Sequence, residues 1–408
     1  MKVVQYILLV IIMALVATAC AAPDQAPEED VQAANPSTIS VSIGDWDSTE
    51  PKNLPDSVSI GVLFGLSGDI AVYGEVQQHG VQLAVEQING SNYLGAGTTL
   101  EALFEDTGAT GEGAIAAMDT VLGKGVVVVV GPTLSTQAFS ADPIAQESGI
   151  PVLGVSNTAN GITNMGDFVF RDSLPEASVV PGTIAQATEI LGLENVGIIW
   201  GNDDDFTASG YEVFKGALAD NNVSIIADET FARGDVDFNA QLTKIIAENP
   251  DALVVSALAQ EAAQIITQSR NLGFEGAIIG GNGFNSPAII SQAGEAAEGV
   301  IVGAAWNIAS DAAISQEFID AFEESFGAAP DQFAAQSYTG VWLIATAIRR
   351  ADSGDPASIR DALAAITNFD SPLGSFSFDA ARNPVHDPVA QIIKDGQYQI
   401  LSVETAQP

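Results

Sequence analysis

The chain has 408 residues, with 52 Asp and Glu against 13 Lys and Arg, which gives a formal net charge of −39 at pH 7. Such an excess of carboxylates repels the phosphates of nucleic acids and excludes nucleic-acid binding as a function class. Cys20 is the only cysteine, so an intrachain disulfide is excluded as well. The acidity fits either a saline habitat or a general acidic bias of the source.

The first predicted element is an export signal. Lys2 precedes an apolar run at residues 7–16, and the small residues 17–19 (ATA) lead directly into Cys20. This order is typical of a cleaved leader, and it resembles a bacterial lipobox, although Ala17 stands where leucine is usual. We predict a lipoprotein signal peptide over residues 1–20 with lipid attached to Cys20. An ordinary secretory signal is the alternative, and a retained transmembrane helix is disfavoured because the apolar run is short.

The leader is followed by a stretch that favours a tether. Residues 21–57 are rich in Ala, Pro, Ser, Asp and Glu and show no sustained apolar periodicity. Such a composition buries too little apolar surface to fold. We therefore predict a disordered acidic linker over residues 21–57. The folded part is then extracytoplasmic, in the periplasm or on the cell surface, and contacts the membrane only through its lipid.

The folded part begins with alternating strands and helices. Apolar runs predict buried strands, and stretches with apolar residues on one face predict helices. The predicted strands are 58–64, 100–104, 126–130 and 151–154, and the helices between and after them are 72–89, 113–122 and 137–147. This order is typical of a parallel sheet with helices on both faces.

The same pattern then restarts, after a predicted crossing at residues 170–181. The strands are 196–200, 223–227, 252–256 and 277–280, with helices at 206–220, 238–248 and 260–272. Residues 312–367 are predicted to be mostly helical, with short closing strands at 376–378, 389–394 and 398–403. The fold class is therefore α/β, with two Rossmann-like lobes whose strand ends face a shared ligand cleft.

Groups that carry catalysis or bind metals are scarce. His79 falls in a predicted helix, and His386 falls in a proline-flanked loop, neither near other ligands at metal-binding spacing. The acidic runs 202–205 (NDDD) and 235–237 (DVD) lack the pattern of a calcium loop, so we interpret them as solvated loops. No nucleophile elbow, phosphate loop or dinucleotide motif is present. We predict no catalytic residue, metal or cofactor.

Hydroxyl-bearing loops follow the first-lobe strands. Residues 131–137 (GPTLSTQ) follow one strand, and residues 155–159 (VSNTA) follow the next. Ser135 and Thr158 in these loops offer side-chain oxygens beside helix N-termini, where an anion such as a carboxylate is favoured. The alternative is that both hydroxyls only cap their helices.

These stretches carry a family resemblance. Residues 59–89 (SIGVLFGLSGDIAVYGEVQQHGVQLAVEQIN), 126–137 (VVVVVGPTLSTQ), 149–163 (GIPVLGVSNTANGIT) and 168–178 (FVFRDSLPEAS) resemble the periplasmic leucine/isoleucine/valine-binding proteins of ABC importers. The resemblance extends over about residues 58–403. It implies a type I periplasmic binding protein-like fold with three crossings that closes on its ligand. The lobes would comprise residues 58–172 plus 305–370 and residues 173–304 plus 371–405.

The resemblance also implies ligand-binding residues. Ser135 matches the serine that binds the ligand α-carboxylate, and Thr158 matches the threonine that binds carboxylate and amine. Ser156 matches a backbone carbonyl that meets the amine, while Tyr73 and Phe206 match positions that flank and cover the ligand.

Two positions depart from the family pattern. Leu258 stands near the position of a tyrosine, and Asn282 stands where amino-acid binders carry a glutamate that pairs with the ammonium. An amide accepts a hydrogen bond but does not neutralise a buried ammonium. Another acid, such as Asp172 or Asp205, would have to substitute for it.

The resemblance implies a solute-binding lipoprotein that captures a small amino acid of branched-chain type and delivers it to an ABC permease, without catalysis. One alternative is a ligand with a carboxylate or amide but no ammonium. Another is a ligand-sensing receptor of the same fold.

Overall fold

The computed structural model of the protein describes residues 50–406. The predicted signal peptide, Cys20 and most of the predicted linker lie outside these residues. The last linker residues depart from the prediction of disorder. The backbone N–H groups of Lys52 and Asn53 donate to the Asp352 carboxylate at 2.7 and 2.8 Å, and strand β1 begins at Ser57. A single acceptor group thus holds this segment to the end of a helix.

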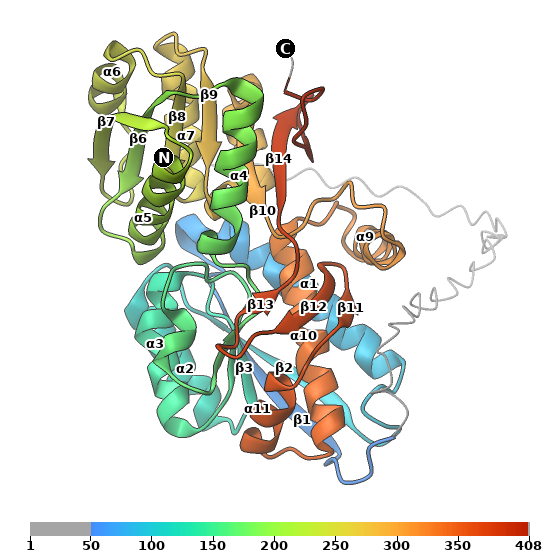
Figure 1. Ribbon diagram of the computed structural model, residues 1–408. Coiled ribbons are helices and arrows are strands. Elements are labelled where there is room, and N and C mark those ends of the chain that lie inside the picture. The colour runs from blue at the N-terminus through green and yellow to red at the C-terminus, as the bar shows by residue number, and fades with distance from the viewer. Residues whose placement is uncertain (1–49, 407–408) are drawn as a thin grey trace, which may run out of the picture. The chain divides into compact units, whose positions relative to one another are not determined.

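The first lobe is built on a parallel five-stranded sheet in the order β2-β1-β3-β4-β5 (Figure 1). Its strands are β1 (Ser57–Phe64), β2 (Thr99–Asp106), β3 (Val128–Val130), β4 (Val152–Gly154) and β5 (Val169–Arg171). Because consecutive strand residues point to opposite faces, both faces need apolar side chains and helices to cover them. On β1, Ile60 and Val62 enter one core and Leu63 enters the other.

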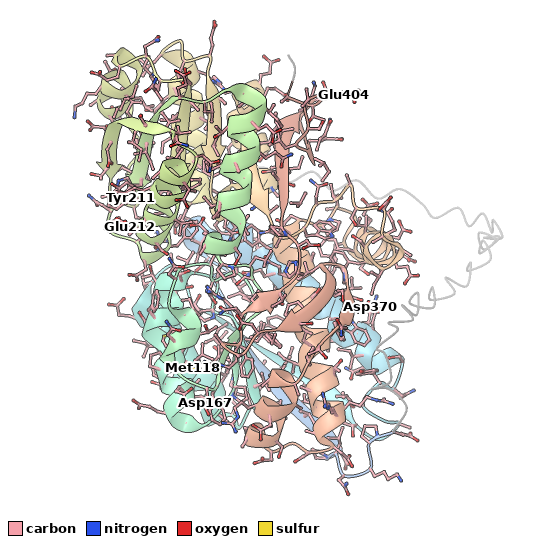
Figure 2. All side chains as sticks on the ribbon, viewed as in Figure 1. Met118, Asp167, Tyr211, Glu212, Asp370 and Glu404 are labelled. Carbon is pink, nitrogen blue, oxygen red and sulfur yellow. The ribbon has the colours of Figure 1, made fainter. Side chains whose placement is uncertain are left out.

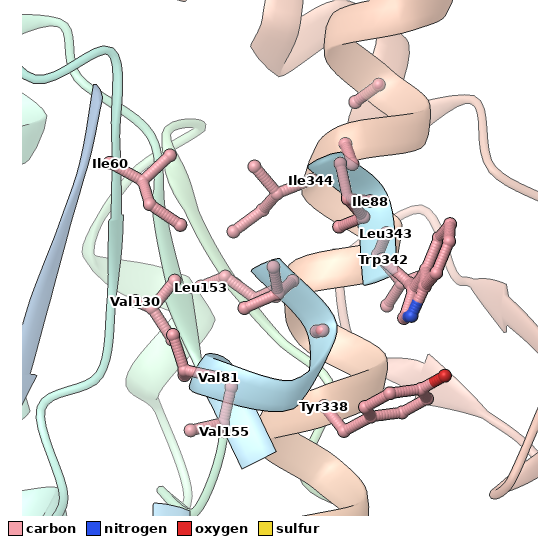
Figure 3. Close-up of a cluster of buried hydrophobic side chains, with 14 of the residues drawn as sticks. Ile60, Val81, Ile88, Val130, Leu153, Val155, Tyr338, Trp342, Leu343 and Ile344 are labelled. Carbon is pink, nitrogen blue, oxygen red and sulfur yellow. The ribbon is translucent and has the colours of Figure 1, made fainter. Parts of the chain in front are cut away.

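Helices cover the two faces of this sheet. The larger core lies beneath α1 (Ala71–Gly90) and α10 (Gln332–Ala351), where Val81 and Ile344 point toward the strand residues Ile60 and Val130 (Figure 3). Helix α10 is buried on every side from Gln332 to Ile348. The other face is covered by α2 (Gly111–Gly123) and α3 (Ser135–Ser148). Helices α9 (Ala313–Phe326) and α11 (Pro356–Ala364) extend the larger core.

The second lobe is built on a seven-stranded sheet in the order β15-β14-β10-β9-β8-β6-β7. Its parallel strands are β6 (Asn195–Gly201), β7 (Ser224–Phe231), β8 (Ala252–Ser256), β9 (Ala277–Gly280) and β10 (Val300–Ala304). Strands β14 (Val389–Lys394) and β15 (Gln397–Ile400) add to one edge antiparallel. The predicted fold class, α/β with two parallel-sheet lobes, is confirmed.

Helices again cover both faces of the second sheet. One core lies under α4 (Glu176–Leu191) and α5 (Asp205–Asp220), and the other under α6 (Asn239–Ala247), α7 (Ala259–Asn271) and α8 (Pro287–Ala293). On β8, Val254 faces the first of these cores while Leu253 and Val255 face the second. Single 3-10 turns lie at Gly68–Ile70, Ile162–Met165, Asn282–Phe284 and Gly294–Ala297.

The first crossing is shorter than predicted. The chain leaves β5 at Arg171 and enters α4 at Glu176, so most of the predicted crossing at 170–181 is strand or helix. Helix α4 was not predicted from the sequence, because Pro181 lies inside it and a proline removes one hydrogen bond of a helix. Burial of Val180 and Ile184 against the second sheet offsets that loss.

The predicted lobe boundary near residue 370 is wrong. Strands β11 (Phe369–Ser371), β12 (Gly374–Phe378) and β13 (Pro384–Val385) form a small antiparallel sheet of their own. Phe376 and Phe378 belong to the core of the first lobe, where Phe378 meets Phe170 edge-on with ring centroids 5.4 Å apart. The chain therefore returns to the second sheet only at β14, because the apolar face of β12 packs against the core of the first lobe.

Acidic side chains project from several surface elements, including Asp167, Glu212, Asp370 and Glu404 (Figure 2). Within residues 50–406, no helix combines the length and apolar character that crossing a bilayer requires.

Candidate functional site

A cavity lies where strand ends of the two sheets face each other. The empty space within it, which includes space open to solvent, is about 290 Å³. Its wall consists of Tyr73, Thr133, Leu134, Ser135, Ser156, Phe206, Leu258, Asn282, Gly283 and Phe333. Of the residues predicted to bind the ligand, all but Thr158 are in this wall. The structure therefore brings together segments that are up to 260 positions apart (73 and 333) in the chain.

The hydroxyls of Ser135 and Thr158 do not serve as helix caps. Ser135 is the first residue of α3, whose N-cap is Leu134, and its Oγ accepts a hydrogen bond from the Ala159 N–H at 3.2 Å. Thr158 is followed by a loop, and its fully buried Oγ1 has no hydrogen-bond partner within the described residues. A buried hydroxyl without a partner costs free energy, but Thr158 does not line the cavity in this arrangement of the chain.

A buried network holds the first-lobe loops in place. Ser156 Oγ donates to the Thr133 carbonyl at 2.6 Å and accepts from Gln77 Nε2 at 2.8 Å. Thr133 Oγ1 in turn donates to Gln77 Oε1 at 2.8 Å and accepts from the Gly65 N–H at 3.1 Å. The Ser156 hydroxyl is thus engaged by protein groups, which leaves its backbone carbonyl as the group predicted to meet an amine.

The rest of the cavity wall is apolar. Phe206 comes from the first turn of α5, Leu258 from the residue before α7, and Phe333 from the first turn of α10. The Tyr73 ring packs edge-on against Phe333 with centroids 4.9 Å apart. Burial raises the pKa of the Tyr73 phenol far above its usual range, so the hydroxyl keeps its proton. This wall favours an apolar ligand side chain.

The two lobes touch around the cavity. Arg233 of the second lobe holds the Asp69 carboxylate of the first, with Nη2 3.0 Å from Oδ2 and 3.1 Å from Oδ1. Thr136 Oγ1 donates to Asp204 Oδ2 at 3.0 Å, and Asp204 Oδ1 caps α5 through the Phe206 N–H. These contacts describe a closed arrangement of the lobes.

Asn282 connects the cavity to both lobes. Its Oδ1 accepts from Gln332 Nε2 at 2.8 Å, and Gln332 Oε1 accepts from the Ala305 N–H at 2.5 Å. The backbone N–H of Asn282 donates to Glu176 Oε1 at 2.9 Å. Burial raises the pKa of Glu176 to about 7, and its Oε2 has no partner within residues 50–406. Glu176 lines a second cavity of about 270 Å³, which shares Asn282 with the first.

The acids suggested from the sequence lie elsewhere. Asp172 is fully buried, and its carboxylate lies against helix α10. A Cβ atom placed on Gly340 of that helix would be only 2.9 Å from Asp172 Oδ2. Asp205 is exposed at the start of α5. Neither lines either cavity. Glu176 is the buried acid bonded to Asn282, and the sequence reading missed it along with α4.

The groups interpreted as structural lie outside the cavity. His79 stacks on Phe326 with ring centroids 4.2 Å apart, and burial lowers the pKa of His386 to about 4. Asp203 Oδ1 accepts from the Arg233 N–H at 2.8 Å. Over the described part of the chain, His, Cys, Asp and Glu side chains form no group of three suited to a metal ion.

Known proteins share this architecture. A family model described as "periplasmic binding protein" matches residues 57–397. The chain belongs to the periplasmic binding protein family. Its location is therefore extracytoplasmic, and the family is one of solute-binding proteins.

Individual relatives span most of the chain. The leucine-, isoleucine-, valine-, threonine- and alanine-binding protein of Pseudomonas aeruginosa is 26% identical over 325 residues, 79% of this chain and 86% of the relative. The branched-chain amino acid transporter substrate-binding protein LivJ of Streptococcus pneumoniae, solved with isoleucine, superposes with a TM-score of 0.79 at 30% identity, over 84% of this chain and 98% of LivJ. A solute-binding protein of an ABC transporter from R. palustris, solved with benzoate, gives a TM-score of 0.76 at 25% identity, over 85% and 95%.

Proposed function

We propose that the protein captures a small apolar amino acid of branched-chain type in the cavity between its lobes and delivers it to the permease of an ABC importer. The observation that carries this proposal is the division of one small cavity into a hydroxyl-bearing side, with Ser135 and Ser156, and an apolar side, with Tyr73, Phe206 and Phe333. Such a cavity matches a ligand with a polar head and an apolar side chain. The relatives from Pseudomonas aeruginosa and Streptococcus pneumoniae support the same ligand class.

The carboxylate of the ligand would bind at the start of α3. Ser135 is the first residue of this helix, where the positive end of the helix dipole and the nearby N–H groups favour an anion. Thr158 lies beside it, since the Ser135 hydroxyl accepts from the residue after Thr158. We propose that Ser135 and the Thr158 hydroxyl bind the carboxylate, which would give the buried Thr158 Oγ1 its partner.

The ammonium of the ligand would be neutralised by Glu176. The Glu176 carboxyl is buried, accepts a hydrogen bond from the Asn282 backbone N–H, and lines a second cavity that shares Asn282 with the ligand cavity. With a pKa of about 7 it ionises readily when a cation approaches. We propose that Glu176 substitutes for the acid missing at Asn282, while Asn282 accepts a hydrogen bond.

A second candidate ligand class is a carboxylate that lacks an ammonium. The neutral amide at Asn282 and the raised pKa of Glu176 favour it, because a protonated Glu176 has no charge to offer. Calorimetry with leucine, isoleucine and valine, and with 4-methylpentanoate as the des-amino analogue of leucine, separates the two classes. Binding of leucine alone supports the first proposal, binding of the analogue alone supports the second, and binding of neither refutes both.

The protein would act as a tethered carrier without catalysis. We propose that lipid on Cys20 anchors it outside the cytoplasmic membrane, with the acidic linker as a spacer. The folded chain would comprise two lobes, 58–172 with 305–385 and 173–304 with 386–405, that close on the ligand and then dock on the permease.

A further inference from the structure

One tyrosine of the cavity wall also joins the two lobes. The Tyr73 side chain belongs to α1 in the first lobe, and it is only 3% exposed. Its hydroxyl donates to the Gly283 carbonyl at 2.9 Å and accepts from the Ala259 N–H at 2.6 Å, and both of these groups belong to the second lobe. With its ring against Phe333, the side chain is held at three points.

The Ala259 N–H is an unusual partner for a side chain of another lobe. Ala259 is the first residue of α7, and the first N–H groups of a helix have no acceptor inside the helix. Helices usually gain one from a Ser, Thr, Asp or Asn at the N-cap, but the N-cap here is Leu258, which has no side-chain acceptor. The Tyr73 oxygen fills that role from across the cleft, at the positive end of the helix dipole.

The neighbouring glycine keeps room for this contact. A Cβ placed on Gly283 would lie 2.4 Å from the Ala257 carbonyl oxygen and 3.3 Å from the Tyr73 hydroxyl. A side chain at residue 283 would therefore clash with the Ala257 carbonyl and crowd the Tyr73 hydroxyl. The ring cannot move away from this position without breaking both hydrogen bonds, so it forms a fixed part of the cavity wall.

We propose that Tyr73 determines ligand size by acting as a helix cap between the lobes: the cap of α7 forms only when the lobes close and the ligand side chain leaves the Tyr73 ring in place. A small side chain allows closure with the cap intact. A bulkier one displaces the ring, and closure then proceeds without the cap. Tyr73 is thus a specificity-determining residue, and this inference rests on the function proposed above.

The test uses Tyr73→Phe, which keeps the ring and removes the cap, and a panel of valine, leucine, methionine and phenylalanine. Leucine affinity should fall about tenfold, which corresponds to the free energy that a helix cap or a hydrogen bond in a buried site usually contributes. Affinity for the largest amino acid that the wild type binds should change less than twofold, because that complex has already lost the cap. The melting temperature without ligand should stay unchanged, since the open form does not use the contact.

The matched control is Tyr398→Phe. The Tyr398 side chain is partly buried, and its hydroxyl lies within hydrogen-bonding distance of two backbone carbonyls, those of Phe284 at 2.6 Å and Ser286 at 2.9 Å, but all of these groups lie in the second lobe. This variant should melt at a lower temperature and keep the wild-type order of ligand affinities. Compaction on ligand addition, followed by small-angle X-ray scattering, should need more leucine for Tyr73→Phe than for either of the other proteins.

Two outcomes overturn the inference. In one, Tyr73→Phe binds leucine with an affinity within twofold of that of the wild type. In the other, the affinity of Tyr73→Phe falls by the same factor for every ligand in the panel, which would mean that Tyr73 does not discriminate ligands by size. Failure of the proposed function looks different: the wild type then binds no amino acid of the panel. In that case 4-methylpentanoate and benzoate replace the panel, and closure on whichever binds tests the cap in the same way.

Discussion

The ion pair between Arg233 and Asp69 gives a quantitative prediction about closure. The guanidinium binds the carboxylate through Nη2 and Nε at 3.0 to 3.2 Å, and its Nη1 donates to the Ala109 carbonyl at 2.8 Å. The side chains of Arg233 and Asp69 are 21% and 27% exposed. Exposed pairs contribute about 0.2–1 kcal/mol, and a bidentate, mostly buried pair contributes more, about 1–2 kcal/mol. Because its two halves come from different lobes, this free energy belongs to the closed form.

Replacing Arg233 by Gln should therefore weaken ligand binding by about 5- to 30-fold in calorimetry at low salt. Asp69→Asn should weaken ligand binding less than Arg233→Gln does. In Arg233→Gln the Asp69 carboxylate keeps its negative charge close to Glu261, whose pKa is raised by burial and also by the charge of Asp69, whereas Asp69→Asn removes that charge. The double variant should bind no worse than Arg233→Gln alone. The difference in ligand affinity between the wild type and Arg233→Gln should shrink as the salt concentration rises from 50 to 500 mM, since the electrostatic screening length falls from about 14 to about 4 Å.

The control is Lys244→Gln, which removes an ion pair with Glu229 (2.9 Å) that lies wholly within the second lobe and should leave ligand affinity unchanged. The reasoning is refuted if Arg233→Gln binds ligand within twofold of the wild type at low salt, or if the losses of the two single variants simply add in the double variant.

Four other predictions concern the binding site, the stability of the protein and the anchor. Ser135→Ala and Thr158→Ala should each weaken ligand binding by about tenfold or more, since each removes a hydrogen bond to a charged group worth roughly 1.5–3 kcal/mol; unchanged calorimetric affinity in both would remove them from the site. Leucine affinity should fall as pH drops through about 7, because protonation removes the charge of Glu176, and Glu176→Gln should bind weakly with no such pH dependence. The raised pKa of Glu176 makes the ligand-free protein more stable as pH falls from 8 towards 5, and Glu176→Gln should show a smaller gain in thermal melts, since Asp331, whose pKa burial also raises to about 7, keeps its share. Cys20→Ser should move the protein from the membrane to the soluble fraction, and an unlipidated wild type in mass spectrometry would contradict the anchor.

The sequence determined the fold class because local patterns carry it. Buried parallel strands are continuous apolar runs, and the valines at 126–130 mark β3 even though the strand itself spans only Val128–Val130. The hydroxyl loops were also visible, since ligand groups of such sheets follow the strand ends and each loop is a continuous segment of chain. Ser135 and Thr158 were named on this basis, whereas the roles of Tyr73, Ser156, Phe206 and Asn282 were implied by the family resemblance.

Only the tertiary structure decided what depends on contacts between distant segments. Glu176 was hidden because its helix contains Pro181, and its link to Asn282 spans 106 positions. Strand β12 joins the first lobe because Phe376 and Phe378 find apolar partners there, which no local pattern encodes. The Tyr73 hydroxyl caps a helix 186 positions away. Local periodicity fixes which elements form, whereas burial and the pairing of polar groups across the cleft decide which residues meet, and that information exists only after folding.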